Sequence, residues 1–200
     1  MFGWDAVRRE LLAMAEEDER VRRELARDGS LFQGYNPRMR AVHNDNAARL
    51  AVILDQHGWP GVPQVGEAGA QAAWLIAQHA IAQPAFQRRV LQSLEPAVRR
   101  GDVPALHAAM LEDRIRCFEG RPQLYGTQFD WDAEGELSPL PMDDPELVDA
   151  RRRELGLRPL AEDLRDRRAE MATGPERPPQ DWATRQREQE AWCREVGWRR

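Results

Sequence analysis

Apolar residues spaced three and four apart run through most of this 200-residue chain, and this period limits its fold more than any other feature. Between residues 4 and 27 they fall at Val7, Leu11, Met14, Val21 and Leu25. Such spacing puts the apolar side chains on one face of an amphipathic α-helix. The same period predicts further helices at about residues 39–56, 67–83, 84–100, 103–118, 145–155, 159–171 and 181–196. The chain is therefore expected to be mostly α-helical.

Glycine and proline mark the ends of these helices. Gly58 suits the C-terminal end of the second predicted helix, and Pro60 prevents its continuation. Pro84 disfavours helical geometry at the residue before it and is favourable in the first turn of the next helix. We therefore expect the third helix to end by Gln83.

Residues 122–141 lack the helical period. They carry turn residues and closely spaced aromatics, which predicts a short hairpin of about residues 124–131 with 136–140. The expected fold is a compact helical bundle with this hairpin, or an irregular insertion, and a C-terminal helix. We expect a helical domain with a polar core site at 1–171, a linker at 172–180 ("ATGPERPPQ") and an amphipathic helix within 181–200, packed on the body or appended to it.

The charge balance and the cysteines exclude several classes of protein. The 29 basic residues are all arginine and face 34 acidic residues, so the net charge of −5 favours neither nucleic acid nor an anionic membrane as partner. Cys117 and Cys193 are too few for a disulfide framework or a zinc knuckle. No stretch approaches the roughly 18 apolar residues of a membrane span, and the first residues do not form an export signal. We expect a cytoplasmic protein.

Polar side chains interrupt the apolar faces of four predicted helices. They are Asp18 on the first, His43 and Asn46 on the second, Gln78 and His79 on the third, and Asp113 and Arg114 on the fifth. A buried unpaired charge costs several kcal/mol, and an unsatisfied neutral polar group costs about 1–3 kcal/mol. These side chains should therefore meet, which predicts a shared polar site inside the helical core. The alternative is that each is a structural histidine or ion pair satisfied by its own neighbours.

The segment "PQLYGTQ" follows the helix that carries Asp113 and Arg114. Gly126 permits a close backbone approach there, and amide and hydroxyl groups suit recognition of a polar ligand. We expect ligand-binding residues in this loop and beside the polar core site, namely Asn46, Gln78, Gln123, Tyr125, Thr127 and Gln128. The alternative is a capped loop that leads into the hairpin.

Several motifs occur together in a fixed order: "AEEDER", "HGWP", "VGEAGAQAAWLIAQHA", "EDRIRCFEGRPQLYGTQFDWD" and "DPELVDARRRELGL". Over about residues 5–160 the chain resembles a widespread bacterial family classed as a domain of unknown function. The resemblance implies a small, mostly helical cytoplasmic protein and implies no activity, substrate or cofactor. In "GYNP" the residue Asn36 stands where the family pattern has histidine, so a role of that histidine is not carried over.

An enzyme is the leading hypothesis for this sequence, in the class of hydrolases and transferases. His79 would act as general acid or base, Asp18 or Asp113 would orient it, and Arg114 would hold an anionic group. His43 completes the predicted catalytic set. The chain has no G-x-G-x-x-G, Walker, H-E-x-x-H or G-x-S-x-G motif, so no organic cofactor is predicted.

Three alternatives stay open. In the first, His43 and His79 with Asp18 or Asp113 bind a divalent metal ion, a variant that no sequence spacing supports. In the second, the pocket binds a polar small molecule or a peptide without turning it over. In the third, Trp182, Trp192 and Trp198 among the arginines of the last helix form a protein-interaction surface.

Overall fold

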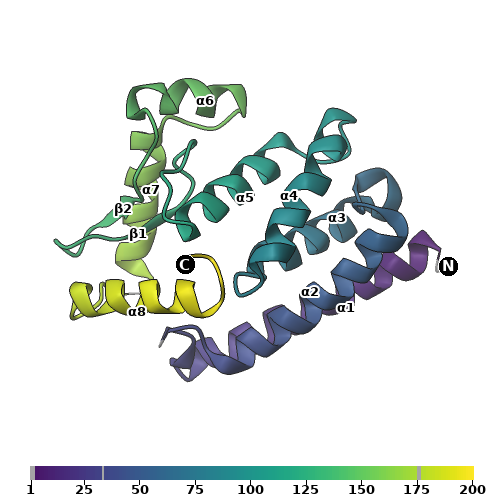
Figure 1. Ribbon diagram of the computed structural model, residues 1–200, viewed down its shortest axis with the longest axis horizontal. Helices are drawn as coiled ribbons and strands as arrows, with labels where there is room; N and C mark the ends of the chain where they lie inside the picture. Colours follow the sequence, from purple (N-terminus) through teal and green to yellow (C-terminus); the bar gives the residue numbers. More distant parts are fainter. Residues whose placement is uncertain (1–2, 33, 175–176) are drawn as a thin grey trace. The chain divides into compact units, whose positions relative to one another are not determined.

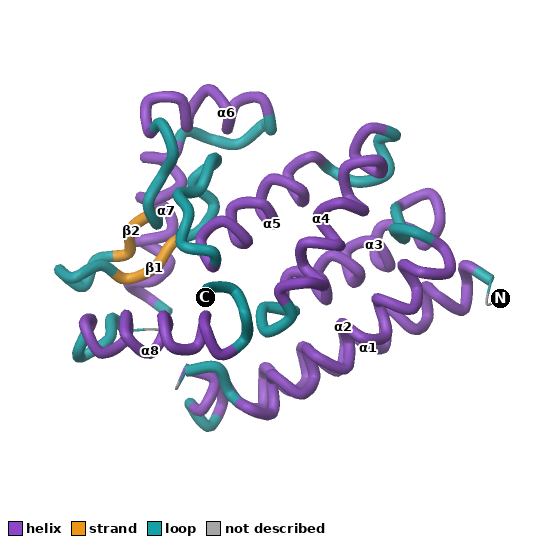
Figure 2. Tube along the Cα trace, viewed as in Figure 1, coloured by secondary structure: helices purple, strands orange, loops and turns teal. Residues whose placement is uncertain are grey.

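The computed structural model describes residues 3–32, 34–174 and 177–200, and its regular structure is mostly helical (Figure 1). Within these residues the β-structure consists of one antiparallel hairpin and an isolated bridge (Figure 2). The prediction of a mostly α-helical chain with a short hairpin is confirmed. None of the described helices combines the length and apolar character needed to cross a bilayer. The chain divides into two compact units, Met1–Ala108 and Ala109–Arg200.

The first unit is built from helices. Its elements are α1 (Trp4–Arg27), the 3-10 turn η1 (Ser30–Phe32), α2 (Pro37–His57), α3 (Val62–His79), α4 (Pro84–Arg99) and the first residues of α5 (Ala105–Phe118). The helix α1 packs against both α2 and α3, and Figures 1 and 2 draw α1 and α2 side by side. The five apolar residues predicted for the buried face of α1 are all buried, and Asp18 shares that face with them.

The starts of α2 and α3 are set by local features that the helical period does not show. The helix α2 starts at Pro37, where the side chain of Asn36 accepts a hydrogen bond from the backbone N–H of Arg38 and so caps the first turn. The segment α3 begins at Val62 with a short turn that Pro63 fits, but Gly66 breaks the helical geometry at a φ of +70°, so the continuous helix begins near Glu67, as predicted. Local capping therefore lengthens α2, whereas the glycine in α3 separates a short first turn from the continuous helix.

The helix α3 ends four residues before Gln83, the latest end that the sequence predicted. The helix ends at His79, where the side-chain amide of Gln87 donates hydrogen bonds to the carbonyl oxygens of Ala77 and Gln78, at 2.9 and 3.1 Å. These bonds satisfy carbonyls that another helical turn would otherwise have paired. His79 thus lies at a helix terminus, where its side chain is only partly covered.

Gly61 occupies a crowded position in the "HGWPG" turn, next to the buried ring of Trp59. The following residue, Val62, donates its backbone N–H to the carbonyl oxygen of Asp102, at 3.2 Å. A Cβ atom on Gly61 would lie 2.8 Å from the Cβ of Asp102 and 3.0 Å from its carbonyl oxygen. Only glycine allows the two segments to approach this closely.

Gly61→Ala is therefore expected to lower the free energy of unfolding by about 1–3 kcal/mol, because the added methyl group forces the backbone apart. Urea denaturation followed by circular dichroism measures the change. Gly174→Ala is the matched control, since the nearest atom to a Cβ there lies 3.5 Å away. Equal stability of the two variants would refute the close approach.

The second unit combines helices with the hairpin. It contains the rest of α5, β1 (Phe129–Trp131), β2 (Leu137–Pro139), the 3-10 turn η2 (Pro145–Leu147), α6 (Val148–Glu154), α7 (Leu160–Thr173) and α8 (Trp182–Glu195). The antiparallel register pairs Phe129 with Pro139, Asp130 with Ser138 and Trp131 with Leu137. The strands are shorter than predicted, because residues 124–128 form a loop, and α7 packs against β2.

The last helix begins as the sequence predicted. The side chain of Asp181 accepts a hydrogen bond from the backbone N–H of Thr184, which caps the first turn of α8. The rings of Trp192 and Trp198 pack on the ring of Phe118, with centroid distances of 5.5 and 5.2 Å. Both tryptophans are therefore used in packing within the second unit.

The predicted linker at residues 172–180 overlaps the end of α7, which extends to Thr173. Residues 175 and 176 of that segment lie outside the described residues. The division into 1–171, 172–180 and 181–200 stays a prediction.

Candidate functional site

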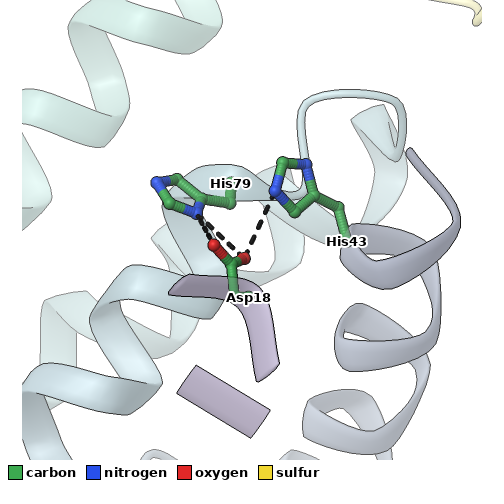
Figure 3. A group of neighbouring side chains, drawn as sticks. All are labelled: Asp18, His43 and His79. Carbon is green, nitrogen blue, oxygen red and sulfur yellow. Dashed lines mark hydrogen bonds and ion pairs between the residues drawn. The ribbon is translucent and has the colours of Figure 1, made fainter. Parts of the chain in front are cut away.

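Asp18, His43 and His79 meet in the interior of the first unit (Figure 3). The carboxylate of Asp18 is 1% exposed, because α1 turns this residue with its apolar face toward α2 and α3. The Nδ1 atom of His79 lies 3.1 and 3.0 Å from the two carboxylate oxygens. The Nε2 atom of His43 lies 3.2 Å from Oδ2 of the same carboxylate. Three helices therefore each contribute one polar side chain to a common point.

The Asp18 carboxyl group is held in its ionised form. Burial alone would raise its pKa, but the contacts and charge of His43 and His79 outweigh burial and hold that pKa well below its ordinary value. At neutral pH the cluster therefore contains a fixed negative charge between two imidazole rings. A charge so deeply buried is stable only with such partners.

The outer nitrogen of His43 has a partner of its own. Its Nδ1 atom lies 2.8 Å from the hydroxyl oxygen of Tyr35, and the two rings stack with centroids 5.7 Å apart. Burial raises the pKa of the Tyr35 phenol, which therefore stays protonated. Tyr35 thus fixes the orientation of the His43 ring and leaves Nε2 directed at Asp18.

His79 is the more accessible of the two histidines. Its side chain is 24% exposed, compared with 10% for His43. In Figure 3 the outer nitrogen of His79 points away from Asp18, while Nδ1 faces the carboxylate. The His79 ring is therefore the part of the cluster that is most exposed to solvent.

Two of the three distances between possible ligand atoms in the cluster are close to those of a small metal site. One ligand atom from each residue can be chosen so that all three lie within 4.8 Å of one another. In a tetrahedral site with metal–ligand bonds of about 2.0–2.2 Å, the ligand atoms lie roughly 3.4 Å apart. The observed Asp18–histidine distances of 3.0 and 3.2 Å differ from this by only a few tenths of an ångström.

The buried Nε2 atom of His43 adds a second reason to consider a metal. Among the residues that the structure describes, this nitrogen makes no well-aligned hydrogen bond, although Asp18 is close. Buried ring nitrogens normally have a partner. A cation between His43, Asp18 and His79 would supply one.

Of the two polar residues predicted to bind ligand in this unit, Asn46 uses its side chain to join two helices, and Gln78 uses its backbone carbonyl group. Asn46 is buried on α2 and donates from Nδ2 to the carbonyl oxygen of Met14 on α1, at 3.2 Å. Gln78 is half-buried at the end of α3, where its carbonyl oxygen accepts the bond from Gln87. Both contacts fix helices that carry the cluster, and a direct role in ligand binding stays a prediction.

Asp113 lies in the second unit, where its loop surrounds it. The fully buried carboxylate accepts hydrogen bonds from the backbone N–H groups of Leu124 (2.7 Å), Tyr125 (3.2 Å) and Thr127 (3.1 Å), and from the Thr127 hydroxyl at 2.9 Å. "PQLYGTQ" thus folds around one carboxylate, which is the capped-loop alternative that the sequence left open. The positive φ of Gly126 (+64°) completes that turn.

The remaining predicted residues also lie in this unit. The buried Gln123 donates from its side-chain amide to the carbonyl oxygens of Gln128 and Leu140, both at 2.9 Å. Arg114 donates from Nε to Oε1 of Gln128, at 3.2 Å. Arg114 and Gln128 both line a cavity of about 510 Å³. Of the residues predicted here, these two therefore face a space that a ligand can enter.

Sequence reasoning missed two residues that matter for these arrangements. Tyr35 lies in "GYNP", a segment without helical period. No pattern in the sequence therefore indicated that its hydroxyl group would lie beside His43. Arg152 lies in a run of three arginines and is 1% exposed. Its position one helical turn after the buried Val148 was the one available signal that it faces inward.

Comparison with known proteins gives one match. A family described as a family of unknown function (DUF6624) matches residues 5–174. That span includes Asp18, His43 and His79 and ends before α8. No curated protein and no solved structure matches the chain.

Proposed function

The chain belongs to the family of unknown function DUF6624, and we propose that Asp18, His43 and His79 bind a divalent transition metal ion for a hydrolytic reaction. The observation that carries this proposal is the meeting of two imidazole nitrogens and one ionised carboxylate, from three helices, at a partly exposed point. The proposed setting is the bacterial cytoplasm, which the resemblance and the free cysteines Cys117 and Cys193 favour.

The donor set suits several metals. Imidazole binds zinc, iron and copper, and a carboxylate extends the range to manganese. Catalytic zinc sites use three protein ligands and keep a further position for water. A metal held by these three residues would lower the pKa of a bound water molecule to about 7 and would thereby supply a hydroxide nucleophile at neutral pH. The exposed side of His79 is where substrate would enter.

Each residue of the cluster has a separate task in this proposal. Asp18 supplies the negative charge that offsets a cation in the protein interior. Tyr35 holds His43 through Nδ1, as the outer nitrogen of a metal-bound histidine is usually held. Asn46 joins α2 to α1 and keeps the ligands in register.

The test is metal-dependent hydrolysis. Purified protein is stripped with a chelator, reloaded with Zn²⁺, Mn²⁺ or Fe²⁺, and assayed on nitrophenyl esters and nitrophenyl phosphates. Loaded protein is expected to hydrolyse at least one of these substrates, and His79→Gln is expected to lower kcat/KM by about a hundredfold or more. The control is His57→Gln, a histidine at the end of α2 outside the cluster. Loaded protein that hydrolyses none of the substrates contradicts the proposal.

A second candidate is an acid–base centre without metal. The Nδ1 atom of His79 lies 3.0 Å from the Asp18 carboxylate, which is the arrangement that orients a general-base histidine and leaves Nε2 for substrate. Hydrolysis that survives complete removal of metal but is lost in His79→Gln supports this candidate over the first.

A further inference from the structure

A small cavity lies within the first unit, between the "HGWPG" turn, α3 and the segment that leads into α5. Its volume is about 270 Å³, just below the range of about 300–1,000 Å³ typical of sites for drug-sized ligands. None of the three cluster residues Asp18, His43 and His79 lines it. The cavity is therefore separate from the metal cluster and has room for a fragment-sized molecule.

The two segments that form its walls are joined through the backbone. Val62 and Asp102 both line the cavity, and the backbone N–H of Val62 donates to the carbonyl oxygen of Asp102, at 3.2 Å. Gly61 allows this approach, as described above for the crowded turn. The walls are therefore held at a fixed separation.

The apolar part of the lining comes from both segments. Trp59 and Val103 are each 6% exposed and line the cavity together with Pro104. The indole ring of Trp59 offers a flat apolar surface, and the face of such a ring also attracts cations.

His107 contributes a hydrogen-bonding group to this lining. Its partly exposed ring stacks on the ring of Trp74, with centroids 4.5 Å apart and planes 4° from parallel. Burial lowers the pKa of His107, so the imidazole is neutral at neutral pH. Among the described residues neither of its ring nitrogens has a hydrogen-bond partner. A neutral imidazole has one accepting nitrogen, which is therefore available to a donor on a ligand.

Both charged side chains of the lining are carboxylates, although the chain contains 29 arginines. Asp102 is paired with Arg100 at 2.8 Å. The exposed Glu67 has no ion-pair partner within the part of the chain that the structure describes. An unpaired carboxylate, together with a neutral imidazole acceptor and the absence of a cationic side chain from the lining, favours a cation that donates hydrogen bonds.

We infer that this cavity binds a small organic cation, whose protonated amine donates hydrogen bonds to Glu67 and His107 and whose apolar part lies against Trp59. The site uses Trp59 of "HGWP" and Glu67 of "VGEAGAQAAWLIAQHA", two motifs from which the metal cluster takes only His79.

The binding test compares two probes that differ in charge. Benzylamine, which is protonated at neutral pH, and the neutral benzyl alcohol are titrated into metal-free, ¹⁵N-labelled full-length protein and followed by nuclear magnetic resonance. The signal of the Trp59 indole N–H is identified by its loss in Trp59→Phe. Saturable binding of benzylamine that shifts this signal, at least about tenfold tighter than binding of benzyl alcohol, is the expected result.

An amine that does not bind, that leaves the Trp59 signal unchanged or that binds no more tightly than the alcohol overturns the inference. Because metal is removed first, neither probe can bind through a metal ion. A failure here is therefore distinct from a failure of the metal site.

Two variants place the bound amine. Glu67→Gln removes the charge with little change in size and is expected to weaken benzylamine binding by about tenfold or more. His107→Phe keeps a ring on Trp74, removes the ring nitrogens and is expected to weaken binding by about threefold or more. Glu16→Gln, at an exposed glutamate of α1 outside the lining, is the matched control and should bind as the unaltered protein does. Equal binding by Glu67→Gln and Glu16→Gln overturns the inference, whatever the result for His107→Phe.

Discussion

Asp18→Asn is expected to weaken Zn²⁺ binding by at least about a hundredfold, since loss of even an outer partner of a metal ligand costs about 10–100-fold. The substitution keeps the shape of the side chain and removes the charge that offsets the cation. Competition with a chromophoric chelator measures the affinity, and circular dichroism checks the fold. Asp45→Asn is the matched control, because Asp45 is a 71% exposed carboxylate on α2. Equal affinities in the two variants would contradict the assignment of Asp18 as a ligand.

Tyr35→Phe should give a smaller loss, of about 10–100-fold, in the same measurement. It leaves all three ligands in place and removes only the hydroxyl group that lies 2.8 Å from Nδ1 of His43. A loss as large as that of Asp18→Asn would mean that Tyr35 does more than orient the ring. No loss at all would mean that it does not orient a ligand.

Arg152→Met is expected to lower the free energy of unfolding by about 3–5 kcal/mol. The guanidinium group is 1% exposed and donates to the carbonyl oxygens of Arg158, Tyr125 and Gly126, at 2.7, 2.9 and 3.1 Å. It also pairs with Asp163 at 2.9 Å. Methionine fills much of the space but leaves these acceptors without their donor, and unsatisfied buried groups are costly.

The adjacent Arg153→Met is the matched control for this prediction, because Arg153 is exposed on the same helix. It is expected to change stability by less than about 0.5 kcal/mol. Arg152→Lys should recover little of the loss, since a single ammonium group cannot replace the planar fork of donors. Urea denaturation of the three variants measures these differences, and equal stability of Arg152→Met and Arg153→Met would refute the structural role.

The spacing of the apolar residues was enough to predict the helices and the buried face of α1. The same spacing identified Asp18, His43 and His79 as polar residues on apolar helix faces, and in the structure these three side chains do meet. The reason is physical: a buried charge has to find a partner, so residues that break the pattern on packed helices tend to converge. Their catalytic or metal-binding roles stay predictions.

The same rule could not say which partner a buried polar group would find. Asp113 breaks the pattern as Asp18 does, but backbone N–H groups of the following loop satisfy it. Every residue except proline has a backbone N–H donor, so the sequence does not show which of these donors will pair with a buried carboxylate. The sequence bounded the end of α3 at Gln83 but did not give its position, because the last carbonyl groups are paired with the side chain of Gln87 from the next helix.

The most direct test of the metal proposal is a crystal structure of protein grown with Zn²⁺, with anomalous diffraction recorded at the zinc edge. We expect a strong peak about 2 Å from a carboxylate oxygen of Asp18, Nε2 of His43 and Nδ1 of His79. A cluster without a peak, in crystals that contain zinc elsewhere, would contradict the assignment of these three residues as a metal centre.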